Sequence, residues 1–403
     1  MDRVVCIVAC LLAAALPAWG QVTGWRGDGT GRYPNSDAPT TWSQTQNVLW
    51  SVEVGPGHGS PIVVGNRVFL TAEPTLLACL DRASGKMLWS VNHTADDLPD
   101  DVSRAPAHRI TDGAGYATQT PASDGQRVYV VFGTGVVAAY DMEGRRLWLR
   151  WFDRPQETGH GRSASPLLVG GRLIVQIGHT MALDPKTGKT LWESPDARPL
   201  YGSPVAAKVG NVDVAVTSGG DLVRAADGTV LTHGLGSLAY VSPIVHEGMI
   251  YLIDGQARAV RLPEKPADSL SPAKLWERTL DGDYYASPVC HEGLLYTVNN
   301  NGLFFVLEAA TGRTVYEKDL GIGAPANIPG KPTSNMYPSL ALVGRHIVVT
   351  NDVGVTLVLA PGRTYREVAR AMLPEGCGGT MAVSGNQLFI RNGRDLFCIG
   401  PKP

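Results

Sequence analysis

The chain has 403 residues and a low content of charged side chains, 18%. Its 35 lysines and arginines nearly balance its 37 aspartates and glutamates, for a formal net charge of −2. Binding to nucleic acid depends on neutralising phosphates, so this balance, with no basic block, argues against a nucleic-acid partner. The 47 glycines and 28 prolines are spread along the chain, which is typical of many short strands joined by tight turns.

Residues 1–20 have the pattern of a secretory signal peptide. An apolar run from Val4 to Leu16 follows a charged start, and small residues precede an expected cleavage site before Gln21. A lipoprotein cleavage box ending at Cys10 is the alternative, but it would fall in the middle of the apolar run. The run is too short to span a bilayer, and no later segment is long enough. We therefore expect a periplasmic or extracellular protein without a transmembrane segment.

A repeated phrase organises the rest of the sequence. LDRASGKMLW ends at Trp89, LDPKTGKTLW ends at Trp192, and a related phrase ends at Tyr316. Each copy opens with a Ser-Pro or Thr-Pro step and an apolar run, and two more apolar segments precede the phrase. Four such strands joined by hairpins form one propeller blade. The prolines that we assign to the openings are Pro61, Pro121, Pro166, Pro204, Pro243, Pro288 and Pro338.

An eighth copy, TMAVSGNQLFIRNGRDLFCIG, lacks the proline and ends after three strands. The missing strand is found at the other end of the domain, as NVLWSVEV from Asn47 to Val54. Pairing the two ends would remove the exposed edges between the first and last blades. We predict an all-β fold: an eight-bladed β-propeller of four-stranded antiparallel blades, covering residues 47–403 and closed by the N-terminal strand. Residues 21–46 are expected to form a lead wrapped on its surface.

The recurring tryptophans are predicted to be structural. Trp50, Trp89, Trp148, Trp192 and Trp276 fall once per blade on the outer strand, where a large flat side chain fills the widening space between blades. The Thr-Gly or Ser-Gly step before them supplies the turn into that strand. The fourth and seventh blades lack the tryptophan.

Four cysteines follow the signal peptide: Cys79, Cys290, Cys377 and Cys398. None has the C-x-x-C spacing of zinc, redox or haem sites. An exported chain could pair Cys398 with Cys377 or with Cys79, but buried free thiols are the expected state.

The phrases ALDPKTGKTLWE and ACLDRASGKMLWSV resemble the tryptophan-docking repeats of the pyrroloquinoline-quinone (PQQ)-like β-propeller family, and the resemblance covers about residues 47–400. The resemblance implies two different functions. Some members are quinoprotein dehydrogenases that hold PQQ and Ca²⁺ on the propeller axis. Others are non-catalytic scaffolds, such as the propeller lipoprotein of the outer-membrane β-barrel assembly machinery. The fold alone does not choose between them.

Several features disfavour the enzyme. Quinoprotein alcohol dehydrogenases carry adjacent cysteines beside the cofactor, and no two cysteines are adjacent here. Those enzymes also stack the quinone on a tryptophan near the axis, whereas most tryptophans here are assigned to outer strands. The His-Glu pairs at 246–247 and 291–292 fall in equivalent hairpin turns, so no metal site is predicted. We expect no cofactor, with PQQ and Ca²⁺ as the alternative.

The candidate binding face carries the loops that lead into each first strand, because strands within a blade alternate in direction. An insertion at residues 93–119 brings an ionisable cluster to this face: Arg104, His108 and Arg109. Neighbouring loops on the same side contribute His160, Arg162 and Asn300. The arginines at 104, 109 and 162 are the expected anion contacts. The alternative is that the insertion is only a solvated loop.

The residue three positions before the opening proline forms a ring around the central channel. In four blades it is a large side chain: His58, Tyr201, Tyr240 and Tyr285. Tyrosines on a rigid ring offer large contact area at little entropic cost, although they could instead simply fill the channel. We predict an exported, monomeric binding or scaffold module for an envelope protein or small ligand, with a PQQ-dependent dehydrogenase as the alternative.

Overall fold

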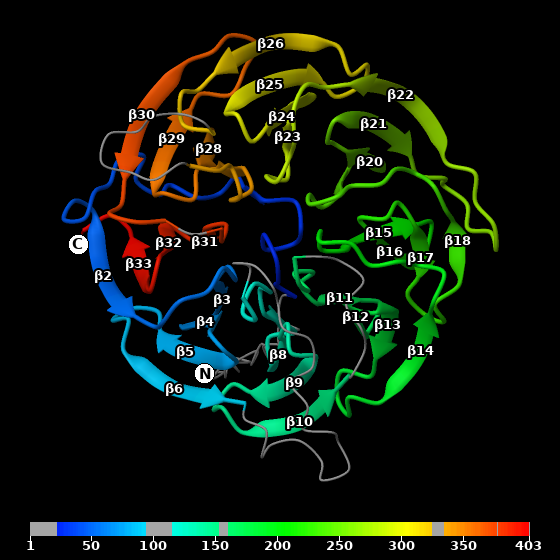
Figure 1. Ribbon diagram of the computed structural model, residues 1–403, viewed down its shortest axis with the longest axis horizontal. Helices are drawn as coiled ribbons and strands as arrows, with labels where there is room; N and C mark the ends of the chain where they lie inside the picture. Colours follow the sequence, from blue (N-terminus) through cyan, green and yellow to red (C-terminus); the bar gives the residue numbers. More distant parts are fainter. Residues whose placement is uncertain (1–21, 94–114, 153–159, 325–333, 377, 403) are drawn as a thin grey trace, which may run out of the picture.

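The computed structural model describes residues 22–93, 115–152, 160–324, 334–376 and 378–402. These residues form eight antiparallel sheets arranged as blades in a ring, which confirms the predicted propeller (Figure 1). Within these ranges there is no helix, and therefore no helix that could cross a membrane. The predicted signal peptide lies outside the described residues.

The first four blades follow the chain, each running from the axis outward. Blade 1 comprises β3 (Ile62–Val64), β4 (Arg67–Ala72), β5 (Leu76–Asp81) and β6 (Met87–Asn92). Blade 2 comprises β7 (Ala122–Ser123), β8 (Arg127–Val131), β9 (Val136–Asp141) and β10 (Arg146–Trp151). Blade 3 comprises β11 (Leu167–Val169), β12 (Arg172–Ile177), β13 (His179–Leu183) and β14 (Thr190–Ser194). Blade 4 comprises β15 (Val205–Val209), β16 (Val212–Val216), β17 (Leu222–Arg224) and β18 (Val230–Thr232).

The other four blades complete the ring. Blade 5 comprises β19 (Ile244–His246), β20 (Met249–Leu252), β21 (Gln256–Arg261) and β22 (Ala273–Thr279). Blade 6 comprises β23 (Val289–His291), β24 (Leu294–Val298), β25 (Leu303–Glu308) and β26 (Thr314–Asp319). Blade 7 comprises β27 (Ala341–Val343), β28 (His346–Thr350), β29 (Val355–Leu359) and β30 (Glu367–Met372). Blade 8 comprises β31 (Ala382–Ser384), β32 (Gln387–Asn392), β33 (Asp395–Ile399) and β2 (Val48–Glu53).

The ring closes through the N-terminal strand, as predicted. Strand β2 pairs antiparallel with β33, from Val48 opposite Ile399 to Glu53 opposite Asp395. The first strand of the domain is therefore the outer strand of the last blade. The closure joins residues more than 300 positions apart in the sequence and leaves no gap between blades 8 and 1.

Burial differs between the inner and outer strands of a blade for a simple reason. The second and third strands are covered on both faces by neighbouring blades, so their sequences are continuously apolar, and β4 and β5 are buried over nearly their whole length. The outer strands face solvent on one side, so β22 alternates, with Trp276 buried among exposed neighbours. Three of the four cysteines are buried free thiols, Cys79 in β5, Cys290 in β23 and Cys398 in β33, and Cys377 lies outside the described residues.

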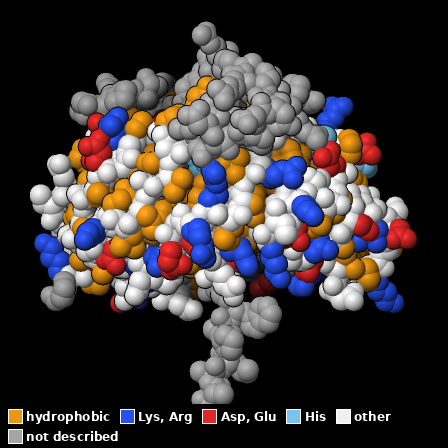
Figure 2. All heavy atoms as spheres, turned by 90° about the horizontal axis from the view of Figure 1, so that it is seen from below, with side chains coloured by type: hydrophobic (Ala, Val, Ile, Leu, Met, Phe, Trp, Pro, Cys, Tyr) orange, Lys and Arg blue, Asp and Glu red, His pale blue; other side chains and the backbone are white. Residues whose placement is uncertain are grey.

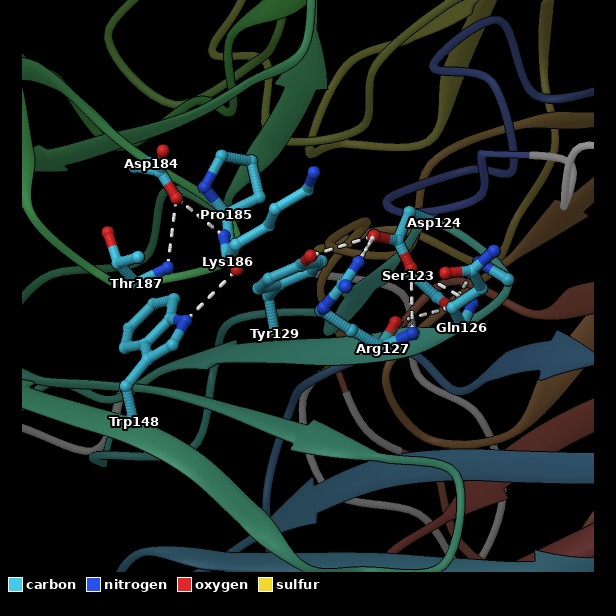
Figure 3. Close-up of polar contacts among 11 residues, drawn as sticks. Ser123, Asp124, Gln126, Arg127, Tyr129, Trp148, Asp184, Pro185, Lys186 and Thr187 are labelled. Carbon is cyan, nitrogen blue, oxygen red and sulfur yellow. Dashed lines mark hydrogen bonds and ion pairs between the residues drawn. The ribbon is translucent and has the colours of Figure 1, made fainter.

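The outer-strand tryptophans of the repeated phrase pack beneath a turn of the next blade. In blade 2, the indole Nε1 of Trp148 donates a hydrogen bond of 3.0 Å to the carbonyl of Pro185 in blade 3 (Figure 3). Gly188 of the same turn lies flat on the indole ring, and a Cβ there would come within 2.6 Å of it. The repeated glycine thus serves two needs, a left-handed backbone with φ +68 and close contact with the neighbouring indole.

The same pairing recurs at four more boundaries between blades. The indole N–H groups donate to carbonyls of the following blade: Trp50 to Arg82, Trp89 to Met142, Trp192 to Ala225 and Trp276 to Ala309. The glycines that cover them are Gly85, Gly144, Gly228 and Gly312. Each of these five indoles therefore lies against the turn of the following blade.

The N-terminal lead is not confined to the surface. It runs through the centre of the ring, where it is drawn in dark blue (Figure 1). Thr23 bridges Ser123 in blade 2, and β1 (Arg32–Tyr33) adds a parallel fifth strand to β27 in blade 7. Arg26 is only 3% exposed. The lead therefore does not only wrap the surface: it reaches the axis, where it pairs with backbone groups of blades 2 and 7.

The glycine beneath each tryptophan can be tested with a matched pair in blade 3. Gly188 and Gly171 have nearly the same φ, +68 and +71, but a Cβ at Gly171 would meet nothing within 4 Å. Gly171→Ala should cost about 1–2 kcal/mol of unfolding free energy from backbone strain alone. Gly188→Ala should cost about 1–3 kcal/mol more, because it also displaces Trp148. Urea unfolding measures both, and equal losses would contradict the packing role.

Candidate functional site

The channel on the propeller axis widens into a funnel on the face from which the first strands begin. Its cavity has a volume of about 540 Å³, within the range of small-molecule sites. Every blade contributes two residues from the extended segment before its first strand. Because side chains two apart in an extended chain point the same way, both residues face the axis. The residue nearer the first strand, which we call the lower one, carries a hydroxyl group in all eight blades. The residue two positions earlier, the upper one, varies from blade to blade.

The eight hydroxyl residues form a closed ring at the base of the funnel. They are Ser60, Thr120, Ser165, Ser203, Ser242, Ser287, Ser339 and Thr380. The backbone N–H of each donates to the side-chain oxygen of its counterpart in the next blade, and the N–H of Thr380 donates to Ser60 Oγ. The distances run from 2.8 Å between Ser203 and Ser242 to 3.2 Å between Ser60 and Thr120. The ring thus links all eight blades at the axis.

These hydroxyl groups keep hydrogen-bonding capacity toward the channel. A hydroxyl has one donor hydrogen and two acceptor lone pairs. In the described part of the chain, each of the eight hydroxyl oxygens accepts one backbone N–H, and none of the eight donates its hydrogen to another described residue. All eight line the cavity. The base of the funnel can therefore both donate to a ligand and accept from it.

An arc of four tyrosines lines one side of the funnel above the hydroxyl ring. Tyr201 stacks on Tyr240 at 5.2 Å between ring centroids, Tyr240 meets Tyr285 edge-on at 4.8 Å, and Tyr285 contacts Tyr337 at 5.2 Å. Tyr240 and Tyr337 are 38% and 44% exposed, so their rings remain accessible. The arc presents a continuous aromatic wall from blade 4 to blade 7.

The opposite side of the funnel has small side chains at the same height. Thr118, Ser163 and Gly378 take the positions that tyrosines occupy in blades 4–7. His58 completes this side, and its Nδ1 accepts the Gly378 N–H at 3.2 Å. The funnel is therefore asymmetric, with an aromatic wall facing a polar one.

His160 extends the aromatic arc at its blade 4 end. Its ring centroid lies 5.7 Å from that of Tyr201 and 6.3 Å from that of Tyr240. Its backbone N–H donates to the Tyr201 hydroxyl at 3.0 Å, and Ser163 Oγ donates to the Tyr201 carbonyl at 2.8 Å. These contacts fix Tyr201 at its side-chain hydroxyl and at its backbone carbonyl.

Asn300 supports the far end of the arc and does not line the funnel. Its side-chain oxygen accepts the backbone N–H of Met336 at 3.0 Å, and its Nδ2 donates to Asn335. Asn335 is in turn bonded through its N–H to Asp352 at 2.7 Å. Asn300 thus fixes the segment that carries Tyr337.

The floor of the funnel comes from the lead. Trp25 lines the cavity, and the guanidinium of Arg26 lies 5.2 Å from the centre of its indole ring. Arg26 Nη2 donates to the carbonyls of Pro288 and Leu340, both at 2.7 Å. Burial lowers the pKa of Arg26 to about 10, so it remains a cation at neutral pH. Trp25 is therefore anchored from below across blades 6 and 7.

The remaining predicted site residues lie elsewhere. Arg104, His108 and Arg109 fall outside the described residues. Arg162 is 8% exposed and its Nη1 donates to the Gly133 carbonyl at 3.0 Å, while its own carbonyl accepts the Gln119 side chain. Its guanidinium therefore lies in the wall between blades 2 and 3 and not in the described lining of the funnel, and its role as an anion contact stays a prediction.

Sequence reasoning missed Tyr337 and Trp25. The sequence pattern indicates Pro338 as the opening proline of blade 7. In the hydroxyl ring, however, Ser339 has the position of the serines and threonine that precede the other opening prolines. Counting back from the first-hairpin glycine would have corrected this: Ser339 precedes Gly344 by five residues, as Ser60 precedes Gly65. No repeat signal marks Trp25, because the lead is not part of the repeat.

The described lining of the funnel contains no Asp, Glu, Lys or Arg. Charged residues lie one layer further out, where Asp283 and Asp352 help burial to raise the pKa values of Tyr285 and Tyr337. These phenols are therefore neutral hydrogen-bond donors at physiological pH. The outer wall is different: Figure 2 shows basic and acidic side chains interspersed with apolar ones.

A second cavity, of about 720 Å³, lies between the lead and the first strands of blades 8 and 1. Its arginines already have partners. Arg67 pairs with Glu143 at 3.0 Å, and Arg82 donates to Gln387 and to the Ser384 carbonyl. The axial funnel, with its unused hydroxyl hydrogens and accessible rings, is the better candidate site.

Comparison with known proteins agrees with the repeat. Residues 40–231 match the family model described as "Outer membrane protein assembly factor BamB". The chain carries PQQ-like propeller repeats. A segment of 193 residues is 28% identical to a quinoprotein ethanol dehydrogenase from Pseudomonas aeruginosa, and it spans 41% of this chain and 29% of that enzyme.

Solved structures show the same fold at low identity. BamB from Moraxella catarrhalis superposes with a TM-score of 0.62 at 15% identity, covering 88% of this chain and 97% of that one. The quinohemoprotein alcohol dehydrogenase from Comamonas testosteroni gives a TM-score of 0.61 at 11% identity, covering 90% and 79%. The fold is therefore common to a dehydrogenase and an assembly factor.

The described funnel does not fit PQQ with Ca²⁺. Trp25 offers a surface on which a flat ring could stack, but PQQ also carries carboxylates, and Ca²⁺ takes about six to eight oxygen ligands in which carboxylates are prominent. The described lining supplies neither a cation nor a carboxylate. Within the described residues, no three His, Cys, Asp or Glu side chains are grouped to hold a metal.

The hydroxyl ring can be tested at Ser242, which accepts the Ser203 N–H at 2.8 Å. Ser242→Ala leaves that buried N–H without its acceptor and should cost about 1–3 kcal/mol of unfolding free energy. Ser242→Thr keeps the oxygen, and threonine already occupies the ring at Thr120 and Thr380, so this control should lose much less. Urea unfolding with equal midpoints for the two variants would show that the ring does not stabilise the fold.

Proposed function

We propose that this chain is an exported, non-catalytic binding or scaffold propeller whose ligand or partner docks in the axial funnel. One observation carries the proposal: the described lining combines an aromatic arc and a ring of hydroxyl groups without any charged side chain. Such a surface suits recognition, because large rigid rings give contact area and hydroxyls give direction. Among the described lining residues there is no carboxylate to act as a general base or as a calcium ligand in a redox reaction.

The export of the protein is part of the proposal. The N-terminal pattern of residues 1–20 supports a cleaved signal peptide and a periplasmic or extracellular location. The match to the assembly factor over residues 40–231 makes an envelope protein a reasonable partner class, alongside a small ligand. A monomeric propeller would leave the funnel open to either.

A PQQ-dependent dehydrogenase is the second candidate. The partial similarity to the quinoprotein ethanol dehydrogenase favours it. The donor set of the described funnel disfavours it, for the reasons given above. Titration of the purified protein with PQQ and Ca²⁺ distinguishes the candidates: the binding proposal predicts no bound quinone absorbance and no alcohol oxidation.

The binding role of the funnel can be tested at Tyr240, which is 38% exposed in the middle of the arc. Tyr240→Ala should reduce recovery of native envelope components at least tenfold, as expected for an aromatic at a binding hot spot. Leu147 is 39% exposed but lies on the outer strand β10, so Leu147→Ala is the matched control and should retain recovery.

Both variants must first show the wild-type circular dichroism spectrum and melting temperature. A folded Tyr240→Ala variant that recovers every component undiminished would remove the funnel from consideration. Quinone-dependent oxidation of an alcohol by the reconstituted protein would instead favour the dehydrogenase.

A further inference from the structure

We propose that the funnel binds a neutral sugar unit, with one face of the sugar ring on the tyrosine arc and its hydroxyls on the serine and threonine ring. The inference rests on the proposed function and names the ligand class of the same site. It follows from the shape of the funnel, from its hydrogen-bonding groups and from the absence of Asp, Glu, Lys and Arg in its described lining.

The shape of the funnel suits a ligand with one apolar face and one polar edge. The tyrosine wall runs from Tyr201 to Tyr337, and the facing positions are the small residues Thr118, Ser163 and Gly378. An aromatic face is electron-rich and attracts the weakly positive C–H groups of a flat saturated ring. A hexose ring presents such C–H groups on its face and hydroxyls around its rim.

The hydroxyl ring selects against a purely apolar ligand. Each of its eight members is buried, lines the cavity and accepts one backbone N–H, which leaves its hydroxyl hydrogen available to a ligand that covers it. An aromatic ligand without polar groups would cover these hydroxyls and leave them unpaired, which is costly. Sugar hydroxyls both donate and accept, so they match groups that do the same.

The absence of charge in the described lining selects against ionic ligands. A carboxylate or ammonium group placed there would lose its hydration without meeting an opposite charge. The Tyr285 and Tyr337 phenols stay protonated, because burial and neighbouring carboxylates raise their pKa values. A neutral sugar loses little by comparison, since every hydroxyl that it buries finds a partner.

The test uses saturation-transfer NMR and calorimetry on the full mature protein, with maltotriose and cellotriose as neutral probes and tri-galacturonic acid as the charged one. The ring C–H protons of at least one neutral probe should receive saturation, and the acid should give no signal. Tyr240→Ala should raise the Kd for that probe at least tenfold, whereas Leu147→Ala should leave it within about twofold.

Two results would overturn the sugar assignment: no saturation transfer to either neutral probe at about 5 mM, or a Kd that Tyr240→Ala leaves unchanged. If the sugars fail while recovery of an envelope component still depends on Tyr240, the sugar assignment is wrong and the binding function stands. If neither sugar binding nor recovery depends on Tyr240, both are wrong.

Discussion

The closed circle of N–H to hydroxyl hydrogen bonds at the axis is the constraint on which the rest of the structure depends. A serine or threonine oxygen lies one bond from Cβ, so each bond fixes the distance between the first strands of adjacent blades. At the rim, the tryptophan of one blade lies against the turn glycine of the next, as Trp148 does against Gly188. The hydroxyl circle sets the inner spacing of all eight blades, and the tryptophan contact sets the outer spacing at five of their boundaries.

The candidate site is a direct consequence of that circle. The aromatic residues lie two positions before the ring hydroxyls, so Tyr201, Tyr240 and Tyr285 are held at one height above Ser203, Ser242 and Ser287. What distinguishes the blades is the side chain allowed at that upper position. Tyrosine in blades 4–7 and small residues in blades 2, 3 and 8 turn a symmetric scaffold into an asymmetric funnel. Variation at a position that the packing leaves open is where function can be expected in a repeat fold.

Much of the fold could be predicted from the sequence because its constraints recur. Four strands per copy and the unpaired segment from Asn47 to Val54 follow from packing that every blade must satisfy, and the strand order confirms both. Three of the four tyrosines of the arc were found by the same periodicity. Tyr337 was not found, because Pro338 resembles an opening proline but precedes Ser339, whereas the other opening prolines follow the ring hydroxyl residue.

Contacts that occur once in the molecule could not be predicted in this way. Arg26 reaches the carbonyls of Pro288 and Leu340, more than 250 residues away, and only the three-dimensional ring brings them together. Trp25 becomes the floor of the funnel for the same reason. Arg162 is expected from the sequence on the binding face, and its guanidinium donates to the carbonyl of Gly133. In each case a long-range hydrogen bond, absent from any local pattern, decides where the side chain lies.

Trp25 makes the central claim directly measurable, because it is the tryptophan that lines the funnel. The measurement is the change in intrinsic fluorescence as maltotriose is added to the wild type and to Trp25→Phe, which keeps an aromatic ring over Arg26. If the funnel is the binding site, the wild type shows a saturable change and the variant loses that change while calorimetry still detects the sugar. An identical change in both proteins, or none in the wild type, would contradict a site for this sugar on the propeller axis.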